Sequence, residues 1–193
     1  MHWVFATLLG YLVGSIPFGL LLAKAAGKGD IRQIGSGNIG ATNVLRTGSK
    51  GLAAAVLLLD AGKGFAAVFA AWRWFPDAVS ATALAAVVGH CFPMWLGFKG
   101  GKGVATNAGV SFGLAWPIGI AYALVWLAIL AVTRISSLAG MSAVVAAAIA
   151  AAALGFVPFA PVLTVIALLV IWLHRENIRR LVAGEEPRVG KGR

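Results

Sequence analysis

The sequence has very few of the residues that form cross-links or hold metal ions. Cys91 is the single cysteine among 193 residues, which excludes an intramolecular disulfide and a cysteine-based zinc cluster. The six acidic residues do not gather in any pattern that is typical of a calcium or magnesium site. We therefore expect the protein to use no metal and no other cofactor.

Several catalytic patterns are missing as well. No Gly-x-Ser-x-Gly run is present, which excludes the nucleophile turn of an α/β-hydrolase. The histidine–aspartate pair of the common soluble-donor acyltransferases is absent, because Trp95 and Arg179 stand five residues after His90 and His174. The glycine-rich run before Gly103 lacks Walker A spacing, and this glycine replaces the Ser or Thr that would bind magnesium. ATP hydrolysis is therefore excluded.

Apolar residues dominate what is present. The chain is 60% hydrophobic and 11% charged, with a mean hydropathy of +0.91, which is rare for a soluble domain. Runs of about 18 or more apolar residues are typical of transmembrane helices. No hydrophilic stretch is long enough for a second domain, so residues 1–193 are expected to form one polytopic membrane domain. The first run, Trp3–Ala26, is too long for a signal peptide and lacks a basic start, which predicts a retained span.

We predict an all-α integral membrane protein with seven transmembrane helices. The expected spans are Trp3–Ala26, Leu52–Ala71, Val79–Gly97, Val104–Trp116, Ile118–Thr133, Ser137–Phe156 and Ala160–Leu173. The fourth and fifth could instead be one long tilted helix, without a break near Pro117, which would give six spans. As a separate helix of about 13 residues, the fourth would cover only about 20 Å, which predicts a cavity near Lys102.

The basic residues favour seven spans over six. The net charge of +10 could indicate nucleic acid in a soluble protein, but here the cations lie in short loops between spans, so we expect no nucleic acid partner. Seven spans leave Arg73 as the single loop cation outside. The cations then inside are Lys28, Arg32, Arg46, Lys50, Lys99, Lys102, Arg134, Arg175, Arg179, Arg180, Arg188, Lys191 and Arg193. We therefore expect the N-terminus outside and the C-terminus in the cytoplasm, with substrate loops facing the cytoplasm.

The first polar loop, Gly35–Lys50, has the composition of an anion-binding site. Closely spaced glycines let backbone N–H groups converge on an anion, and the hydroxyl and amide side chains add donors. Arg46 offers a planar fork that suits phosphate. The candidate binding residues are Ser36, Gly37, Asn38, Thr42, Asn43 and Arg46. The alternative is a turn-rich loop with helix caps, which the same residue types favour.

The second polar loop, Phe98–Asn107, places lysines and glycines before the start of a helix. Backbone amides and the positive end of the helix dipole attract phosphate. The candidate residues are Lys99, Gly100, Gly101, Lys102, Gly103 and Thr106. The alternative is a basic turn at the membrane face.

The third polar segment is His174–Leu181, at the end of the last span. Helical spacing puts His174 and Asn177 on one face and Arg175 and Arg179 on another. The alternative is an ordinary amphipathic helix end with cytoplasmic positive charge.

Several further charged or titratable residues are candidates for supporting roles. Asp60 and Lys63 lie three residues apart inside the second span, where charges are costly, and a structural ion pair is favoured over substrate contact. His90 lies in the third span, where it can simply be hydrogen-bonded to a neighbouring helix. Glu176 and Arg179 complete this group.

The three motifs resemble those of the PlsY-type acyl-phosphate:glycerol-3-phosphate acyltransferases of bacteria. They read SGNIGATNVLR, GHCFPMWLGFKGGKGVAT and HRENIRRLVAGEE, in the order of that family. The family's GSIPFG run at Gly14–Gly19 and its Asp-x-x-Lys-Gly run at Asp60–Gly64 are also present. The resemblance covers nearly the whole chain.

The resemblance implies transfer of an acyl group from acyl phosphate to the 1-hydroxyl of glycerol 3-phosphate. The products are lysophosphatidic acid and inorganic phosphate, for phospholipid synthesis at the cytoplasmic face of the plasma (inner) membrane, downstream of a soluble enzyme that forms acyl phosphate. The family's glycerol-phosphate site is carried onto Ser36, Arg46, Lys102, His174 and Asn177, as the catalytic set. Lys99–Gly103 would hold the acyl-phosphate group, and the acyl tail would lie along the apolar helices.

The family resemblance implies that a substrate phosphate takes the hydroxyl proton. His174 as the general base is the competing view. We favour a binding role, because the flanking arginines disfavour protonated imidazole. Two other function classes remain: a transporter of phosphorylated metabolites, which would be expected to show internal repeats, and a scaffold that binds anionic lipid through the basic tail.

Overall fold

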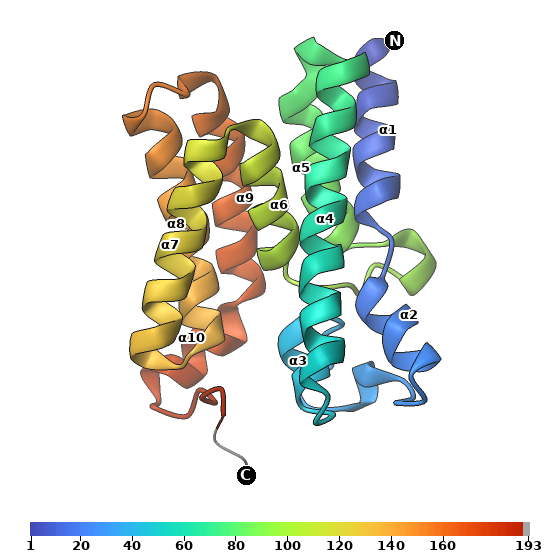
Figure 1. Ribbon diagram of the computed structural model, residues 1–193, viewed down its shortest axis with the longest axis vertical. Helices are drawn as coiled ribbons and strands as arrows, with labels where there is room; N and C mark the ends of the chain where they lie inside the picture. The colour runs from blue at the N-terminus through green and yellow to red at the C-terminus, as the bar shows by residue number, and fades with distance from the viewer. Residues whose placement is uncertain (191–193) are drawn as a thin grey trace.

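The computed structural model describes residues 1–190, and this part of the chain is built from helices with no β-strand. Lys191 and Arg193 of the predicted basic tail lie outside it. The α-helices are α1 (His2–Gly14), α2 (Phe18–Ala25), α3 (Ala41–Leu45), α4 (Lys50–Trp74), α5 (Val79–Cys91), α6 (Val104–Leu114), α7 (Trp116–Thr133), α8 (Ser136–Ala153), α9 (Ala160–Leu173) and α10 (Arg175–Val182). Short 3₁₀ turns cover Ile31–Gln33, Pro76–Ala78, Met94–Leu96 and Val157–Phe159. The longer helices run side by side along the long axis (Figure 1).

Helix length and composition give fewer membrane crossings than the seven predicted from the sequence. Within residues 1–190, five helical segments are long and apolar enough to span, or six if the bent pair Val157–Leu173 plus Arg175–Val182 is one span. Helix α6 is too short to count as a span, because its 11 residues reach only about 16 Å. The seven-span count and the orientation of the termini therefore stay predictions.

The predicted fourth and fifth spans are two separate helices, as expected. The break falls at Ala115, whose backbone is extended, and Pro117 lies in the first turn of α7, where a missing N–H costs little. The prediction placed the break near Pro117, and the structure confirms it to within two residues.

The predicted first and third spans are each found as a candidate span, at His2–Ala25 and Pro76–Leu96, but neither is one continuous α-helix. Trp3–Ala26 is divided into α1 and α2 by the Ser15–Pro17 segment, because proline cannot donate to the helix ladder and restricts the residue before it. Val79–Gly97 is α-helical only to Cys91, and Pro93 follows within two residues. This early end leaves room for the glycine-rich loop to fold back into the bundle.

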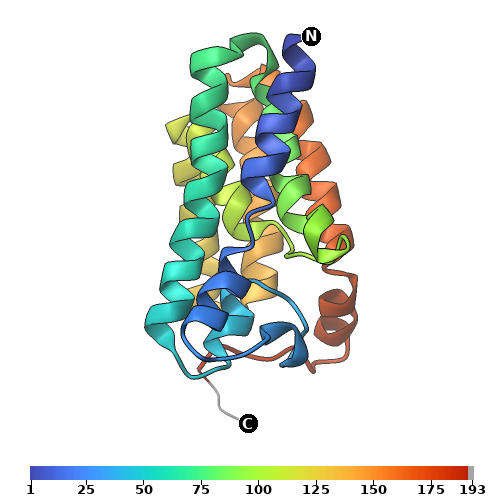
Figure 2. The same ribbon diagram turned by 90° about the vertical axis from the view of Figure 1, so that its right-hand side faces the viewer.

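Small residues let the helices approach closely. Glycines stand where a Cβ would overlap a neighbouring backbone, with Gly10 and Gly14 between α1 and α5 and Gly64 and Gly109 between α4 and α6. The main apolar core lies among α4 to α9. A second, smaller core joins α2, α3 and the start of α4. It lies at the end of the bundle opposite the N-terminus, where it supports the first polar loop (Figure 2).

Candidate active site

The second and third motifs meet in one cluster. Lys102, just before α6, donates from Nζ to the Oδ1 of Asn177 on α10. His174, at the junction of α9 and α10, is buried and lies close enough to Lys102 to respond to its charge. Burial lowers the pKa of Lys102, and Arg180 and Arg175 add to the effect. The cluster thus holds donors and positive charge with little solvent, which suits an anion.

His174 has a defined tautomer in this cluster. Its Nδ1 lies 2.7 Å from the carbonyl oxygen of Val170, which can only accept, so Nδ1 carries the proton. Nε2 of the neutral ring therefore keeps its lone pair. Burial lowers the pKa of His174 to about 4, and Lys102 adds to the shift. The imidazole is neutral near pH 7 and is able to accept one hydrogen bond.

Glu186, on the segment after α10, completes the cluster, and the sequence analysis missed it. Its Oε1 accepts from Asn177 Nδ2 at 2.5 Å and from Ser137 Oγ at 2.6 Å, and its Oε2 accepts from Arg180 Nε at 2.7 Å. Burial alone would raise the pKa of this carboxyl, but the three hydrogen bonds outweigh it and hold the pKa below its usual range. The Gly-Glu-Glu ending of the third motif was the available signal.

The first polar loop is organised from within by Asn43. This buried side chain donates from Nδ2 to the carbonyls of Ile31 (2.7 Å) and Asn38 (2.8 Å). Its Oδ1 accepts from the backbone N–H of Ser36 at 3.2 Å and from its hydroxyl at 3.4 Å. Every side-chain hydrogen bond that Asn43 can make is thus used within the protein, three inside the loop and one to Ile31 before it, although it is predicted to bind substrate. That prediction has not been tested, and the geometry favours a structural role.

The side chains that this loop presents to solvent are the candidate ligands. Ser36, Thr42 and Arg46 are exposed. Arg46 packs against Gly35, which has φ +57 and no room for a Cβ. Gly37 is also left-handed (φ +68), and Asn38 Oδ1 accepts from the Gly40 N–H at 2.7 Å. The loop lies at the same end of the bundle as α10 (Figures 1 and 2).

The glycine-rich loop is fastened to the open end of α5. Gly100 donates its N–H to the carbonyl of Cys91 (3.0 Å), and Gly101 donates to that of His90 (2.9 Å). These bonds satisfy carbonyls that the helix end would leave unpaired. Gly103 is left-handed (φ +84) and packs among apolar side chains. These contacts fix the backbone of the loop and thereby position Lys102 in the cluster.

Besides the first loop and the buried group described below, four predicted residues lie outside the cluster. Lys99 is exposed. Glu176 and Arg179 form a solvent-exposed ion pair at 3.0 Å. Thr106 is fully buried, with its methyl group against Gly64 of α4. Their proposed contributions to binding or support stay predictions.

Asp60, Lys63 and His90 form a separate buried group. Lys63 Nζ lies 2.9 Å from Asp60 Oδ1, as the predicted pair requires. The same oxygen is 3.7 Å from His90 Nδ1, and Lys63 also donates to the Ile16 carbonyl at 2.7 Å. The lone-histidine interpretation of His90 was thus too simple, because it faces a carboxylate.

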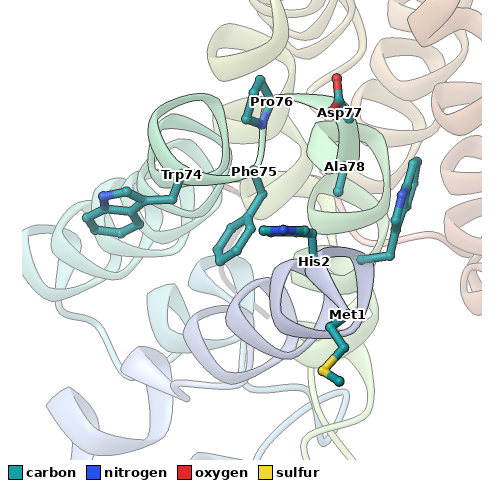
Figure 3. Close-up of a pocket in the computed structure, with 8 residues that line it drawn as sticks. Met1, His2, Trp74, Phe75, Pro76, Asp77 and Ala78 are labelled. Carbon is teal, nitrogen blue, oxygen red and sulfur yellow. The ribbon is translucent and has the colours of Figure 1, made fainter.

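Two hollows lie away from the polar motifs. One, of about 290 Å³, is near the N-terminus between the start of α1 and the α4–α5 turn, where His2, Phe75 and Asp77 line it (Figure 3). The other, of about 360 Å³, is an open apolar groove between α4 and α6, lined by residues such as Phe65 and Phe112. Neither contains a residue of the cluster.

The chain is similar to known proteins along nearly its whole length. The family model described as glycerol-3-phosphate acyltransferase matches residues 4–184. The glycerol-3-phosphate acyltransferase of Erythrobacter litoralis is 70% identical over 96% of this chain and 94% of its own length. That of Mesorhizobium japonicum is 55% identical over 97% and 96%.

Similar solved structures indicate the same family. The crystal structure of PlsY (YgiH), an integral membrane glycerol 3-phosphate acyltransferase, in its glycerol 3-phosphate form has a TM-score of 0.93 and 41% identity, covering 98% of this chain and 96% of that one. Its lysophosphatidic acid form has a TM-score of 0.90. Motifs, fold and relatives agree, and the chain therefore belongs to the PlsY-type membrane glycerol-3-phosphate acyltransferases.

Proposed function

We propose that this acyltransferase uses acyl phosphate as its donor and releases lysophosphatidic acid and inorganic phosphate, without a metal. It would act at the cytoplasmic face of the inner membrane, on acyl phosphate made by a soluble enzyme. The observation that carries the proposal is the convergence of Lys102, His174 and Asn177. Helix α10, which carries Asn177, lies at the same end of the bundle as α3, which belongs to the Ser36–Arg46 loop (Figure 1). A membrane protein with anion sites at one end suits two phosphorylated substrates.

The residues divide between the two phosphates. Arg46 and Ser36 on the first loop, with Lys102, Asn177 and His174, would hold glycerol 3-phosphate. The backbone N–H groups of the glycine-rich loop, with Lys99, would hold the phosphate of the donor. The acyl tail would extend along the apolar helices.

The reaction needs positioning more than it needs a protein nucleophile. The 1-hydroxyl oxygen attacks the acyl carbon, the bond from that carbon to the phosphate oxygen breaks, and inorganic phosphate leaves with the electron pair. Acyl phosphate is already an activated anhydride, so alignment and neutralisation of the two phosphates supply much of the catalysis. The hydroxyl proton passes to a substrate phosphate.

His174 fits a binding role better than a role as base. Its Nε2 lone pair can accept a hydrogen bond from a substrate hydroxyl. A pKa of about 4 lies well below neutral pH, where an efficient general base should have a pKa nearer 7.

The donor prediction has a direct test. Purified protein given acyl phosphate and glycerol 3-phosphate is expected to release inorganic phosphate and form lysophosphatidic acid in the presence of a chelator. Substitution of Ser36 by alanine is the matched loss-of-function control. Full turnover with acyl-CoA, with acyl phosphate inert, would contradict the proposal.

The topology is tested separately. Helices α1 with α2, α4, α5, α6, α7, α8 and α9 would make seven crossings, with α6 as a short one. The N-terminus and helix α10 lie at opposite ends of the bundle (Figure 1), as an odd count requires. A reporter fused to the C-terminus is expected to be active only in the cytosol. Activity confined to the outside would reject this topology.

A further inference from the structure

A buried charged group occupies the middle of the bundle without touching the cluster of Lys102, His174 and Asn177. The side chains of Asp60, Lys63 and His90 are each at most 3% exposed. Buried ion pairs are weak evidence for stability, because well-packed apolar residues are often as stable or more so. Within the described residues Lys63 Nζ lies 2.9 Å from Asp60 Oδ1, whereas His90 Nδ1, at 3.7 Å from the same oxygen, has no hydrogen-bond partner. A contribution to folding stability is therefore a poor explanation for the presence of these three buried residues.

One end of the group reaches the first polar loop. Lys63 donates to the Ile16 carbonyl at 2.7 Å, inside the break between α1 and α2. Helix α2 begins immediately after this break, and its Gly19 lies so close to the Ile39 carbonyl that a Cβ would overlap it. Ile39 belongs to the Ser36–Arg46 loop and is buried in the same small core as Leu20 of α2. Lys63 therefore fixes the position at which the first loop is seated.

The other end lies under the glycine-rich loop. The Gly101 N–H donates to the His90 carbonyl at 2.9 Å. The Cα of Gly101 packs so closely on the His90 imidazole that a Cβ at position 101 would overlap the ring atoms Nε2, Cε1 and Cδ2. The His90 ring thus supports Gly101, the residue that precedes Lys102.

We propose that Asp60, Lys63 and His90 are positioning residues that set the glycine-rich loop relative to the first loop. Asp60 lies on the 25-residue helix α4, and its Oδ1 faces Lys63 on the same helix and His90 on α5. The group thereby fixes the spacing between the two phosphate sites. This rests on the proposed function, in which the first loop and the glycine-rich loop hold different substrates. Reacting groups must meet within a narrow range, and misplacement by about 1 Å can cost about 100-fold in rate.

The experiment separates positioning from folding. Asp60→Asn, Lys63→Met and the double variant are compared for melting temperature and for kcat and KM with each substrate. Each single variant leaves a polar or charged partner unmatched and is expected to melt lower. The double variant removes both charges and is expected to recover most of the melting temperature. Its kcat/KM is nevertheless expected to stay at least about tenfold low, because the Ile16 carbonyl loses its Lys63 donor and His90 no longer faces a carboxylate.

A matched control and a second measurement complete the design. Thr82 is buried and joins α5 to α1 through a 3.0 Å hydrogen bond to the Ala6 carbonyl, far from both loops. Thr82→Val is expected to lower the melting temperature with both KM values unchanged. Amide hydrogen exchange of residues 35–46 and 97–103 is expected to be faster in the double variant and unchanged in Thr82→Val.

The outcomes are distinct. Recovery of wild-type kinetics and loop exchange by the double variant would overturn the positioning role and leave a purely structural ion pair. A wild-type protein inactive with acyl phosphate would reject the proposed function instead, while the exchange experiment still decides on the link between the loops.

Discussion

Lys102→Ala is expected to lower kcat/KM by at least about tenfold, and Arg46→Lys to impair activity although it keeps the charge. A charge-assisted hydrogen bond in a partly screened site contributes about 1.5–3 kcal/mol, and about 1.4 kcal/mol corresponds to tenfold in rate. Lys102 is half-buried and already aimed at Asn177, while Arg46 is exposed on the loop. Lysine cannot reproduce the bidentate fork of arginine.

Melting temperature separates ligand binding from packing in these variants. Neither substitution removes core packing, so the protein without substrate should melt within a few degrees of the wild type. The controls are Lys24→Ala and Arg32→Lys, exposed residues outside the three motifs, which should keep normal kinetics. Near-normal activity in both Lys102→Ala and Arg46→Lys would mean that the basic loops act only as topology signals.

Glu186→Gln is expected to lower both stability and activity. The carboxylate accepts from Ser137, Asn177 and Arg180, whereas an amide brings its own N–H₂ toward those donors. Loss of about 1.5–3 kcal/mol would lower the melting temperature by about 3–12 °C. Asn177 would also lose the partner that orients its Oδ1 toward Lys102, so KM for glycerol 3-phosphate should rise.

The pH dependence of stability gives this prediction a second readout. The folded-state pKa of Glu186 lies below its ordinary value of about 4.3, so its contribution is complete above that value and is lost as pH falls through the lower folded one. Glu186→Gln should remove this part of the acid sensitivity. Glu185→Gln, at the exposed neighbouring position, is the control. Equal melting curves and kinetics for both variants would show that Glu186 is not part of the site.

Local chemistry was readable from the sequence. Apolar runs predict the helices, Pro117 predicts the break between α6 and α7, and the three motifs indicate the family. The pairing of Asp60 with Lys63 also followed from their spacing, because residues three apart share a helix face. All these features depend on neighbours in the chain.

Other features were decided by tertiary structure, because they join residues far apart in sequence. The contact of Lys102 with Asn177 requires α10 to bend back at His174, and the role of Glu186 requires the last segment to cross to Ser137. His90 meets Asp60 only because α4 and α5 pack together. Asn43 resembles a ligand by residue type, but the fold uses all its side-chain hydrogen bonds within the loop and to Ile31 before it. Residue type determined which groups can bind phosphate, whereas helix packing decided which of them are left with a free donor.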